Sequence, residues 1–362
     1  MNTYAIWGAP TSCKTESLED SFTASGHNFG NILIGNGLTS NLNNAEIIPL
    51  SQARNSGDIK KCSRILIPAA NFLWEGFDFG FLADELAETT LPITMIGLGS
   101  QSKDRVIKPK INAGTLRLIK LISQRSPSIG VRGHYTAELL CSLGITNSIP
   151  LGCPSFYTKG NLGIDNLADI PFEDSSLNSL RTCINGSRRV ARHSFFPSAM
   201  QQAENIILQH GILRNSPFIA QDEIDEIRLA RGDQAVLLND AASYFSSVSP
   251  SDVRDYFKSK TIYFTDFNPW SEFVRSYDLV LGTRFHGCLI ALLSGTPSLL
   301  VVHDSRTLEM AEIAGIPYVL ANQLRTMQDL EEHIRSLKFE LFKHNMSALT
   351  QKFNAFKRDH EL

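Results

Sequence analysis

Short apolar runs alternate along the chain with longer stretches whose apolar residues recur at helical spacing. The runs that predict strands in the first half are residues 4–7, 65–69, 93–98, 129–131 and 149–151. Those in the second half are residues 183–184, 217–220, 262–264, 279–281 and 298–302. Strands that alternate with helix-length stretches are typical of βαβ units, so the pattern predicts parallel sheets.

The stretches between these runs predict the helices. They cover residues 81–88, 113–123, 135–143, 199–209, 270–277, 287–293 and 308–313. After Pro317 we expect two further helices, 327–337 and 339–356, and no further strand. A C-terminal helix of that length would pack back across the preceding domains.

The alternation breaks once, where residues 158–179 are rich in Asn, Asp, Ser and Gly. A polar break of this kind is typical of a linker between domains. We therefore predict an α/β protein with a Rossmann-like domain at 1–160, a linker at 161–180, a second Rossmann-like domain at 181–325 and C-terminal helices at 326–362. Two doubly wound parallel sheets of similar size imply a cleft between them, and ligands bind beyond the carboxyl ends of such strands.

Composition narrows the function classes. The 362 residues are 43% hydrophobic and 20% charged, with a formal net charge of −3, so nothing favours binding to nucleic acid. The six cysteines are scattered without a CxxC pair, which argues against a zinc site, and we predict no metal. The sequence shows neither a signal peptide nor a transmembrane segment, and we expect a cytoplasmic protein.

The most informative segment is 282–287, Gly-Thr-Arg-Phe-His-Gly, which lies between a buried strand and an apolar helix. We expect a turn that carries Arg284 and His286 to the helix N-terminus. A guanidinium beside free N–H groups makes an anion site, and an imidazole there, with a pKa near ~6.5, is suited to proton transfer. The alternative is that Arg284 forms a salt bridge and His286 only packs.

Two more arginines follow predicted strands. Arg306 lies after the run 298–302, in the first turn of a helix that Asp304 or Ser305 would cap. Arg132 directly follows the run 129–131 and would reach the cleft from the first domain. Either arginine alone fits an exposed or structural role equally well.

Asn71, Gly99 and Gln101 lie at other predicted strand ends, where they form candidate ligand loops or else plain tight turns. The loop that holds Asn28 and Asn31 is either a ligand loop or a plain helix start. The segment 8–15 is similar to a phosphate-binding P-loop motif, but Cys13 occupies the position of the second glycine of that motif. We therefore reject a nucleoside triphosphatase.

Together these segments resemble the polysaccharide pyruvyl transferase family over most of the chain. The resemblance is strongest over residues 279–319 and recurs at 131–136, 143–144 and 152–155, with weaker similarity at 96–101 and in the Asn28–Asn31 loop. It implies a GT-B-like architecture, with two Rossmann-like domains around a cleft. It also implies phosphoenolpyruvate as the donor substrate, with no further cofactor.

The family's donor-site residues correspond here to Arg132, Arg284, His286 and Gly287, and His286 is the expected catalytic residue. Arg306 occupies the place of a basic residue that is often Lys in the family, which keeps the charge and alters the geometry. The acceptor would be a glycan or a lipid-linked sugar, which is compatible with peripheral membrane contact. Two other interpretations stay open: a GT-B glycosyltransferase that uses a nucleotide sugar, and a non-catalytic sugar-binding homologue.

Overall fold

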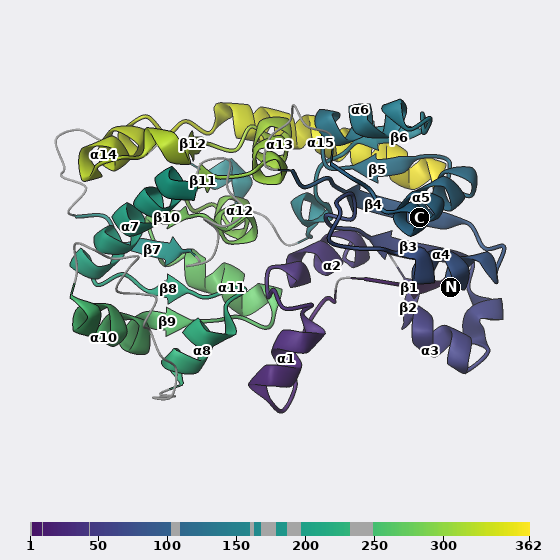
Figure 1. Ribbon diagram of the computed structural model, residues 1–362, viewed down its shortest axis with the longest axis horizontal. Helices are drawn as coiled ribbons and strands as arrows, with labels where there is room; N and C mark the ends of the chain where they lie inside the picture. Colours follow the sequence, from purple (N-terminus) through teal and green to yellow (C-terminus); the bar gives the residue numbers. More distant parts are fainter. Residues whose placement is uncertain are drawn as a thin grey trace.

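Two parallel β-sheets lie side by side, each covered by helices (Figure 1). The computed structural model describes residues 2–8, 10–42, 44–102, 109–159, 163–167, 179–186, 197–231 and 249–362. Most of the predicted linker, 161–180, therefore lies outside the described residues. No described helix has the length and apolar character needed to cross a membrane.

The first half holds six strands, β1 Thr3–Ile6, β2 Glu46–Pro49, β3 Arg64–Pro68, β4 Ile93–Leu98, β5 Ile129–Val131 and β6 Ser148–Pro150. Its helices are α1 Leu18–Ala24, α2 Asn31–Thr39, α3 Leu50–Asn55, α4 Gly80–Ala87, α5 Ala113–Gln124 and α6 His134–Ser142.

The second half holds β7 Thr182–Asn185, β8 Phe218–Ile219, β9 Thr261–Ile262, β10 Leu279–Gly282, β11 Ser298–Val302 and β12 Tyr318–Leu320. Its helices are α7 Pro197–Leu213, α8 Ile224–Ala230, α10 Pro250–Lys260, α11 Phe267–Val274, α12 Phe285–Leu293, α13 Ser305–Ala314, α14 Met327–Arg335 and α15 Glu340–Asp359.

Strand order places one ligand-binding position in each sheet. The orders are β2-β1-β3-β4-β5-β6 and β12-β11-β10-β7-β8-β9, and the paired strands are parallel throughout. The direction of winding reverses between β1 and β3 in the first sheet and between β7 and β10 in the second. Crevices open at the carboxyl ends of the strands at such reversals. The predicted fold class, two Rossmann-like halves in a GT-B-like arrangement, is confirmed.

Two strands escaped the sequence prediction, and both lie at sheet edges. The expectation of no strand after Pro317 is wrong, because β12 follows it directly. Edge strands are half solvated, so β12 begins with a Tyr318 that is 37% exposed, and β2 has no fully buried residue. Strand β2 begins with Glu46 and ends with Pro49, and β12 is only three residues long, so neither gives the longer apolar run by which a buried parallel strand is recognised.

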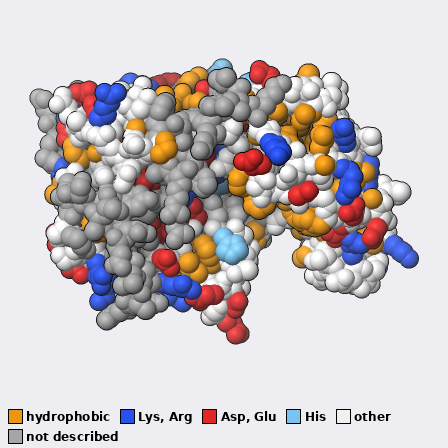
Figure 2. Space-filling model, viewed as in Figure 1, with side chains coloured by type: hydrophobic (Ala, Val, Ile, Leu, Met, Phe, Trp, Pro, Cys, Tyr) orange, Lys and Arg blue, Asp and Glu red, His pale blue; other side chains and the backbone are white. Residues whose placement is uncertain are grey.

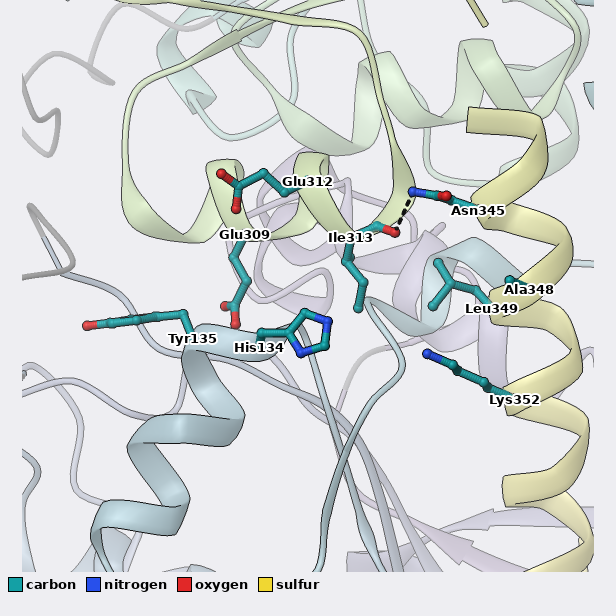
Figure 3. Close-up of a pocket in the computed structure, with 9 residues that line it drawn as sticks. All are labelled: His134, Tyr135, Glu309, Glu312, Ile313, Asn345, Ala348, Leu349 and Lys352. Carbon is teal, nitrogen blue, oxygen red and sulfur yellow. Dashed lines mark hydrogen bonds between the residues drawn. The ribbon is translucent and has the colours of Figure 1, made fainter. Parts of the chain in front are cut away.

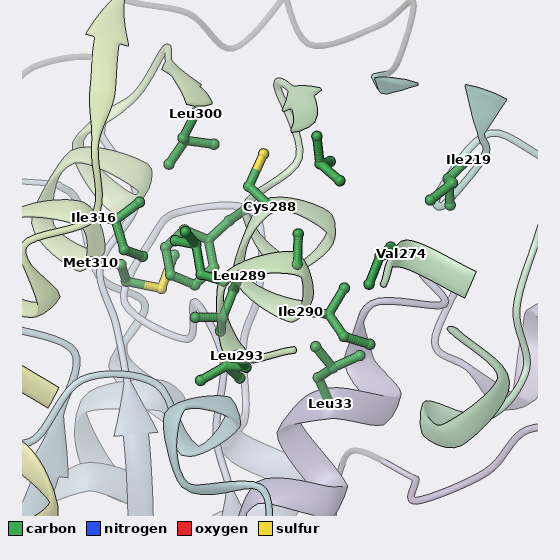
Figure 4. Packing of buried hydrophobic residues seen from close by; sticks show 14 of the residues in the cluster. Leu33, Ile219, Val274, Cys288, Leu289, Ile290, Leu293, Leu300, Met310 and Ile316 are labelled. Atoms are coloured by element: carbon green, nitrogen blue, oxygen red, sulfur yellow. The ribbon is translucent and has the colours of Figure 1, made fainter. Parts of the chain in front are cut away.

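Helix α12 lies at the centre of the second half, and all nine of its residues are buried. A helix that is apolar on every side must be enclosed on every side. Its Ile290 and Leu293 lie beside Leu33 of α2, which belongs to the first half (Figure 4). Helix α12 therefore packs against both halves.

Helix α15 returns from the second half to the first and ends beside α5 and β5 (Figure 1). There the fully buried imidazole of His360 contacts two hydroxyls of the first sheet, with Nδ1 2.9 Å from Oγ1 of Thr94 and Nε2 3.1 Å from Oγ of Ser128. The ring also stacks on Phe356 at a centroid distance of 3.9 Å. The last helical turn thus attaches the end of the chain to the first half.

Burial, with a smaller contribution from Arg64, lowers the pKa of His360 to about 4. The unfolded chain takes up this proton below about pH 6.5, so stability falls as the pH drops from 6.5 towards 4. Between pH 8 and pH 5, we expect the free energy of unfolding to fall by about 2 kcal/mol less in His360→Gln than in the wild type. Urea unfolding at the two pH values measures it, and exposed His344→Gln on the same helix is the control. Equal losses in the two variants would contradict the assignment.

Candidate active site

A cavity of about 540 Å³ lies at the carboxyl ends of the strands of both sheets. Eight of the ten residues predicted from the sequence line it: Asn28, Asn31, Asn71, Gln101, Arg132, Arg284, His286 and Arg306. Gly99 and Gly287 do not line it, and each instead makes room for a neighbouring side chain. The residues that line the cavity come from both halves of the molecule.

The segment 282–287 begins at the winding reversal of the second sheet. A Cβ on Gly282 would lie 2.3 Å from the carbonyl oxygen of Asn185 at the end of β7, and one on Gly287 would lie 1.9 Å from Oδ1 of Asn185. Both glycines therefore let β10 and α12 pack against Asn185. Arg284 is the N-cap of α12, and His286 lies in the first helical turn rather than in the predicted turn before it.

His286 is 7% exposed, and its Nε2 lies 3.6 Å from Sγ of Cys153. Burial, together with the positive charges of Arg132 and Arg306, lowers the pKa of its imidazole to about 3. The sequence expectation of a pKa near ~6.5 is therefore wrong. The imidazole is neutral at physiological pH and can accept a proton.

Arg284 forms an ion pair with Asp222, which follows β8. The alternative predicted for Arg284, a salt bridge, is thus observed, and this salt bridge lies at the cavity. Two atoms of the pair, Nε of Arg284 and Oδ1 of Asp222, are buried without a hydrogen-bond partner among the described residues. Asp222 was missed from the sequence, although it lies two residues after the predicted strand 217–220.

Arg306 projects from the first turn of α13, and its Nη2 lies 3.2 Å from Oδ2 of Asp304. Asp304 is the N-cap of α13, one of the two residues predicted for that position, and accepts a hydrogen bond of 2.8 Å from the Thr307 amide. Burial raises the pKa of Asp304, but Arg306, His303 and Thr307 together hold it below its usual range. The carboxylate is therefore charged and keeps Arg306 beside the cavity.

Arg132 is 2% exposed and donates from Nε to the carbonyl of Gly97 over 3.0 Å and from Nη1 to Oδ1 of Asn71. Asn71 in turn donates to Oε1 of Gln101 over 3.2 Å. A Cβ on Gly99 would lie 2.5 Å from Cδ of Arg132. The candidate ligand loop at 99–101 therefore serves first to hold Arg132, whose pKa is lowered by burial although a guanidinium keeps its proton.

The Asn28–Asn31 loop joins the two halves at the opposite wall of the cavity. Oδ1 of Asn28 accepts from the amide of Gly30 and from Nε2 of Gln221, both over 2.8 Å. Asn31 donates to the carbonyl of Ser25 over 2.9 Å. These amide groups line the cavity while their own hydrogen bonds fix the shape of the loop.

A second cavity, of about 300 Å³, lies between α6, α13 and α15, and Glu309 of α13 points toward the start of α6 there (Figure 3). Glu309 accepts two hydrogen bonds from Thr136, 2.7 Å from the amide and 2.8 Å from Oγ1. Since Thr136 lies in the first turn of α6, this carboxylate caps a helix of the other half. The same α13 carries Arg306, so one helix connects the cation of the second half to the segment that carries Arg132.

The fold and the cavity define a two-domain α/β protein with a cavity between its halves that is lined by three arginines. The family model of the polysaccharide pyruvyl transferases matches residues 28–305, more than half of the chain, and the protein belongs to that family. It is accordingly a transferase of the class that acts on polysaccharides. No protein of curated function shows significant sequence similarity to the chain.

Solved structures with related folds have low sequence identity. A putative UDP-N-acetylglucosamine 2-epimerase from Listeria monocytogenes is 11% identical with a TM-score of 0.49, covering 100% of this chain and 96% of its own. The UDP-GlcNAc 2-epimerase from Methanocaldococcus jannaschii, in complex with UDP-GlcNAc and UDP, is 10% identical with a TM-score of 0.44, covering 98% and 100%. The wall teichoic acid polymerase TagF is 11% identical with a TM-score of 0.40, covering 99% and 86%.

The contact between Glu309 of α13 and the start of α6 can be tested by a substitution at Gly133. Gly133 has extended backbone, with φ −178°, but a Cβ there would lie 2.3 Å from Cγ of Glu309. We expect Glu309→Ala to lower the free energy of unfolding by roughly 2–3 kcal/mol, because Thr136 loses both partners. Gly133→Ala should destabilise the wild type and cost little in the Glu309→Ala background.

Denaturant unfolding of the two single variants and the double variant measures this coupling. Glu312→Ala, an exposed position on the same helix, is the control. If Gly133→Ala costs the same in both backgrounds, the contact between Glu309 and α6 does not hold the halves together.

Proposed function

We propose that the protein transfers the pyruvyl group of phosphoenolpyruvate onto a pair of hydroxyls of a glycan or glycan precursor, which forms a pyruvate ketal and releases phosphate. The observation that carries this proposal is the convergence of Arg132, Arg284, Arg306 and His286 on one cavity. They come from the ends of three strands in two sheets. Membership of the polysaccharide pyruvyl transferase family supports the same reaction.

The donor carries a phosphate and a carboxylate, so it needs several fixed cations at short range. Arginine suits both groups, because its planar guanidinium donates two parallel hydrogen bonds to either. Asp222 and Asp304 hold Arg284 and Arg306 in place, and the Nε atoms of both arginines are buried without a hydrogen-bond partner among the described residues. Each guanidinium can therefore give further hydrogen bonds to a bound anion.

Ketal formation requires two carbon–oxygen bonds to form at C2 of the donor while the bond from C2 to the phosphate oxygen breaks. C3 gains a proton and becomes a methyl group, C2 becomes cation-like, and one sugar hydroxyl adds to it. Phosphate leaves and the second hydroxyl closes the ketal. Of the two hydroxyl protons, one balances the proton gained at C3 and the other leaves with phosphate. In this scheme the arginines stabilise the departing phosphate.

His286 is the group proposed to move protons. Its neutral imidazole can accept a hydroxyl proton, because burial and two neighbouring guanidinium groups keep it from being protonated. A bound anionic donor offsets the charges of Arg132 and Arg306, which raises the proton affinity of the imidazole during the reaction. The same residue can therefore take up a proton and return it.

We expect phosphoenolpyruvate to bind the wild type saturably and Arg306→Gln roughly ten- to a hundredfold more weakly, since a charge-assisted hydrogen bond is lost. Calorimetry measures both affinities, and Arg117→Gln, an exposed substitution on α5, is the control. Arg132→Ala, checked for folding by its melting curve, should weaken binding as well. Saturable binding of a nucleotide sugar, with none of phosphoenolpyruvate, would contradict the proposal in favour of glycosyl transfer.

We expect His286→Gln to lower kcat by about 10²–10⁴-fold and to leave the donor Kd within a few-fold of wild type. Phosphate release in the presence of acceptor gives kcat, and calorimetry gives Kd. His344→Gln, far from the cavity on α15, should change neither. Near-normal turnover in a folded His286→Gln variant would remove His286 from the mechanism.

A further inference from the structure

One wall of the cavity is aromatic and belongs entirely to the first half. Trp7 follows β1, and Phe72 and Trp74 follow β3, so the wall stands at the winding reversal of the first sheet. Phe77 and Phe79 continue it toward α4, and all five aromatic residues line the cavity. The second half supplies Arg284, His286 and Arg306 instead. Donor chemistry assigns no role to this wall.

The aromatic rings of this wall pack against one another. Phe72 and Phe79 stack at a centroid distance of 4.2 Å, and Trp7 meets both edge-on, at 5.9 and 6.1 Å. Trp74 packs edge-on against Phe77 at 5.4 Å. Such a cluster offers rigid apolar faces at little cost in conformational entropy.

The loop that carries these rings is held in one shape by hydrogen bonds from the start of α5. Asn112 donates to the carbonyls of Glu75 and Phe77, over 3.0 and 2.8 Å, and the Phe79 amide donates to Oγ1 of Thr115 over 3.1 Å. A Cβ on Gly76 would lie 2.1 Å from Cη2 of Trp74, so the loop turns closely around that indole. The wall is therefore built in advance of any ligand.

Phe77 is nevertheless 54% exposed. An anchored loop that presents a large apolar ring to solvent leaves apolar surface for a partner to cover. Figure 2 shows hydrophobic side chains gathered over the first half, on the right of the view.

The cavity has more room than the donor needs. Cavities of ~300–1,000 Å³ accommodate drug-sized ligands, whereas a three-carbon phosphate ester fills only part of 540 Å³. The remaining space is bounded by the aromatic wall and by the side-chain amides of Asn31, Asn71 and Gln101. Apolar ring faces next to amide groups match a pyranose, which has one C–H face and a rim of hydroxyls. A polyprenyl chain has no hydroxyls to add to the hydrogen bonds that these amides already make.

We propose that Trp7, Trp74 and Phe77 form the acceptor subsite, where they stack on a pyranose of the acceptor and direct its hydroxyl pair toward Arg132 and His286. This assignment rests on the proposed pyruvyl transfer and adds the place and the ring chemistry of the acceptor. The sugar thus binds to the first half and the charged donor mainly to the second, so both substrates meet where the halves face each other.

The chain offers a matched pair of exposed phenylalanines for the test. Phe77 lines the cavity, whereas Phe81, which is 58% exposed and packs on Trp7 at 6.2 Å, does not. The full chain is titrated with methyl α- and β-glycosides of glucose, galactose, mannose and N-acetylglucosamine in the presence of phosphoenolpyruvate. Tryptophan fluorescence reports binding, because two of the three tryptophans, Trp7 and Trp74, line the cavity.

We expect at least one glycoside to bind, with Phe77→Ala weakening it about five- to tenfold and leaving the Kd for phosphoenolpyruvate unchanged. Phe81→Ala should leave both affinities unchanged. Equal effects of Phe77→Ala and Phe81→Ala would overturn the subsite, as would intact donor binding with no glycoside bound by the wild type. A third outcome would reassign the wall to lipid. In that case the wild type binds vesicles that contain a polyprenyl phosphate but no glycoside, and Phe77→Ala abolishes the binding of vesicles. If the wild type does not bind phosphoenolpyruvate, the result counts against pyruvyl transfer itself.

Discussion

Burying a guanidinium is costly unless its hydrogen bonds are satisfied, and Arg132 meets this requirement without a carboxylate bonded to it among the described residues. A backbone carbonyl and the amide oxygen of Asn71 accept its hydrogen bonds, so the side chain keeps its positive charge directed at the cavity. Its surroundings follow from that requirement. Gly99 has no side chain because Arg132 lies against it, and Gln101 orients Asn71. The low pKa of His286 comes partly from the same unneutralised charge.

The site also depends on contacts that keep the two halves at a fixed separation. Ser305 of α13 donates to the carbonyl of Ser102 over 2.9 Å, and Glu309, one turn later, caps α6. At the far end of the first half, His360 is enclosed between Thr94 and Ser128. Contacts on two sides of the first sheet therefore oppose rotation of one half against the other. The distances between cations on opposite sheets are set by these contacts.

Residues that follow a buried strand could be predicted from the sequence, since a short apolar run and the polar residue after it are local in the chain. Arg132, Arg284 and Arg306 were found in this way, and all three line the cavity. Two contacts could not be predicted, because the pairing of Arg284 with Asp222 and the approach of Cys153 to His286 depend on how distant segments pack. The pKa of His286 was mispredicted for the same reason, since burial is a property of the assembled fold.

The ion pair between Arg284 and Asp222 places a carboxylate of the protein itself beside one of the cations of the site. Any incoming phosphate or carboxylate competes with a tethered carboxylate whose local concentration never falls. The net affinity for an anion is therefore a difference between two ion pairs and is smaller than either alone. In the proposed reaction the same competition would act on the phosphate product, since Asp222 could pair with Arg284 again as phosphate departs. An internal competitor of this kind lowers the affinity for an anionic ligand and favours rapid release of an anionic product.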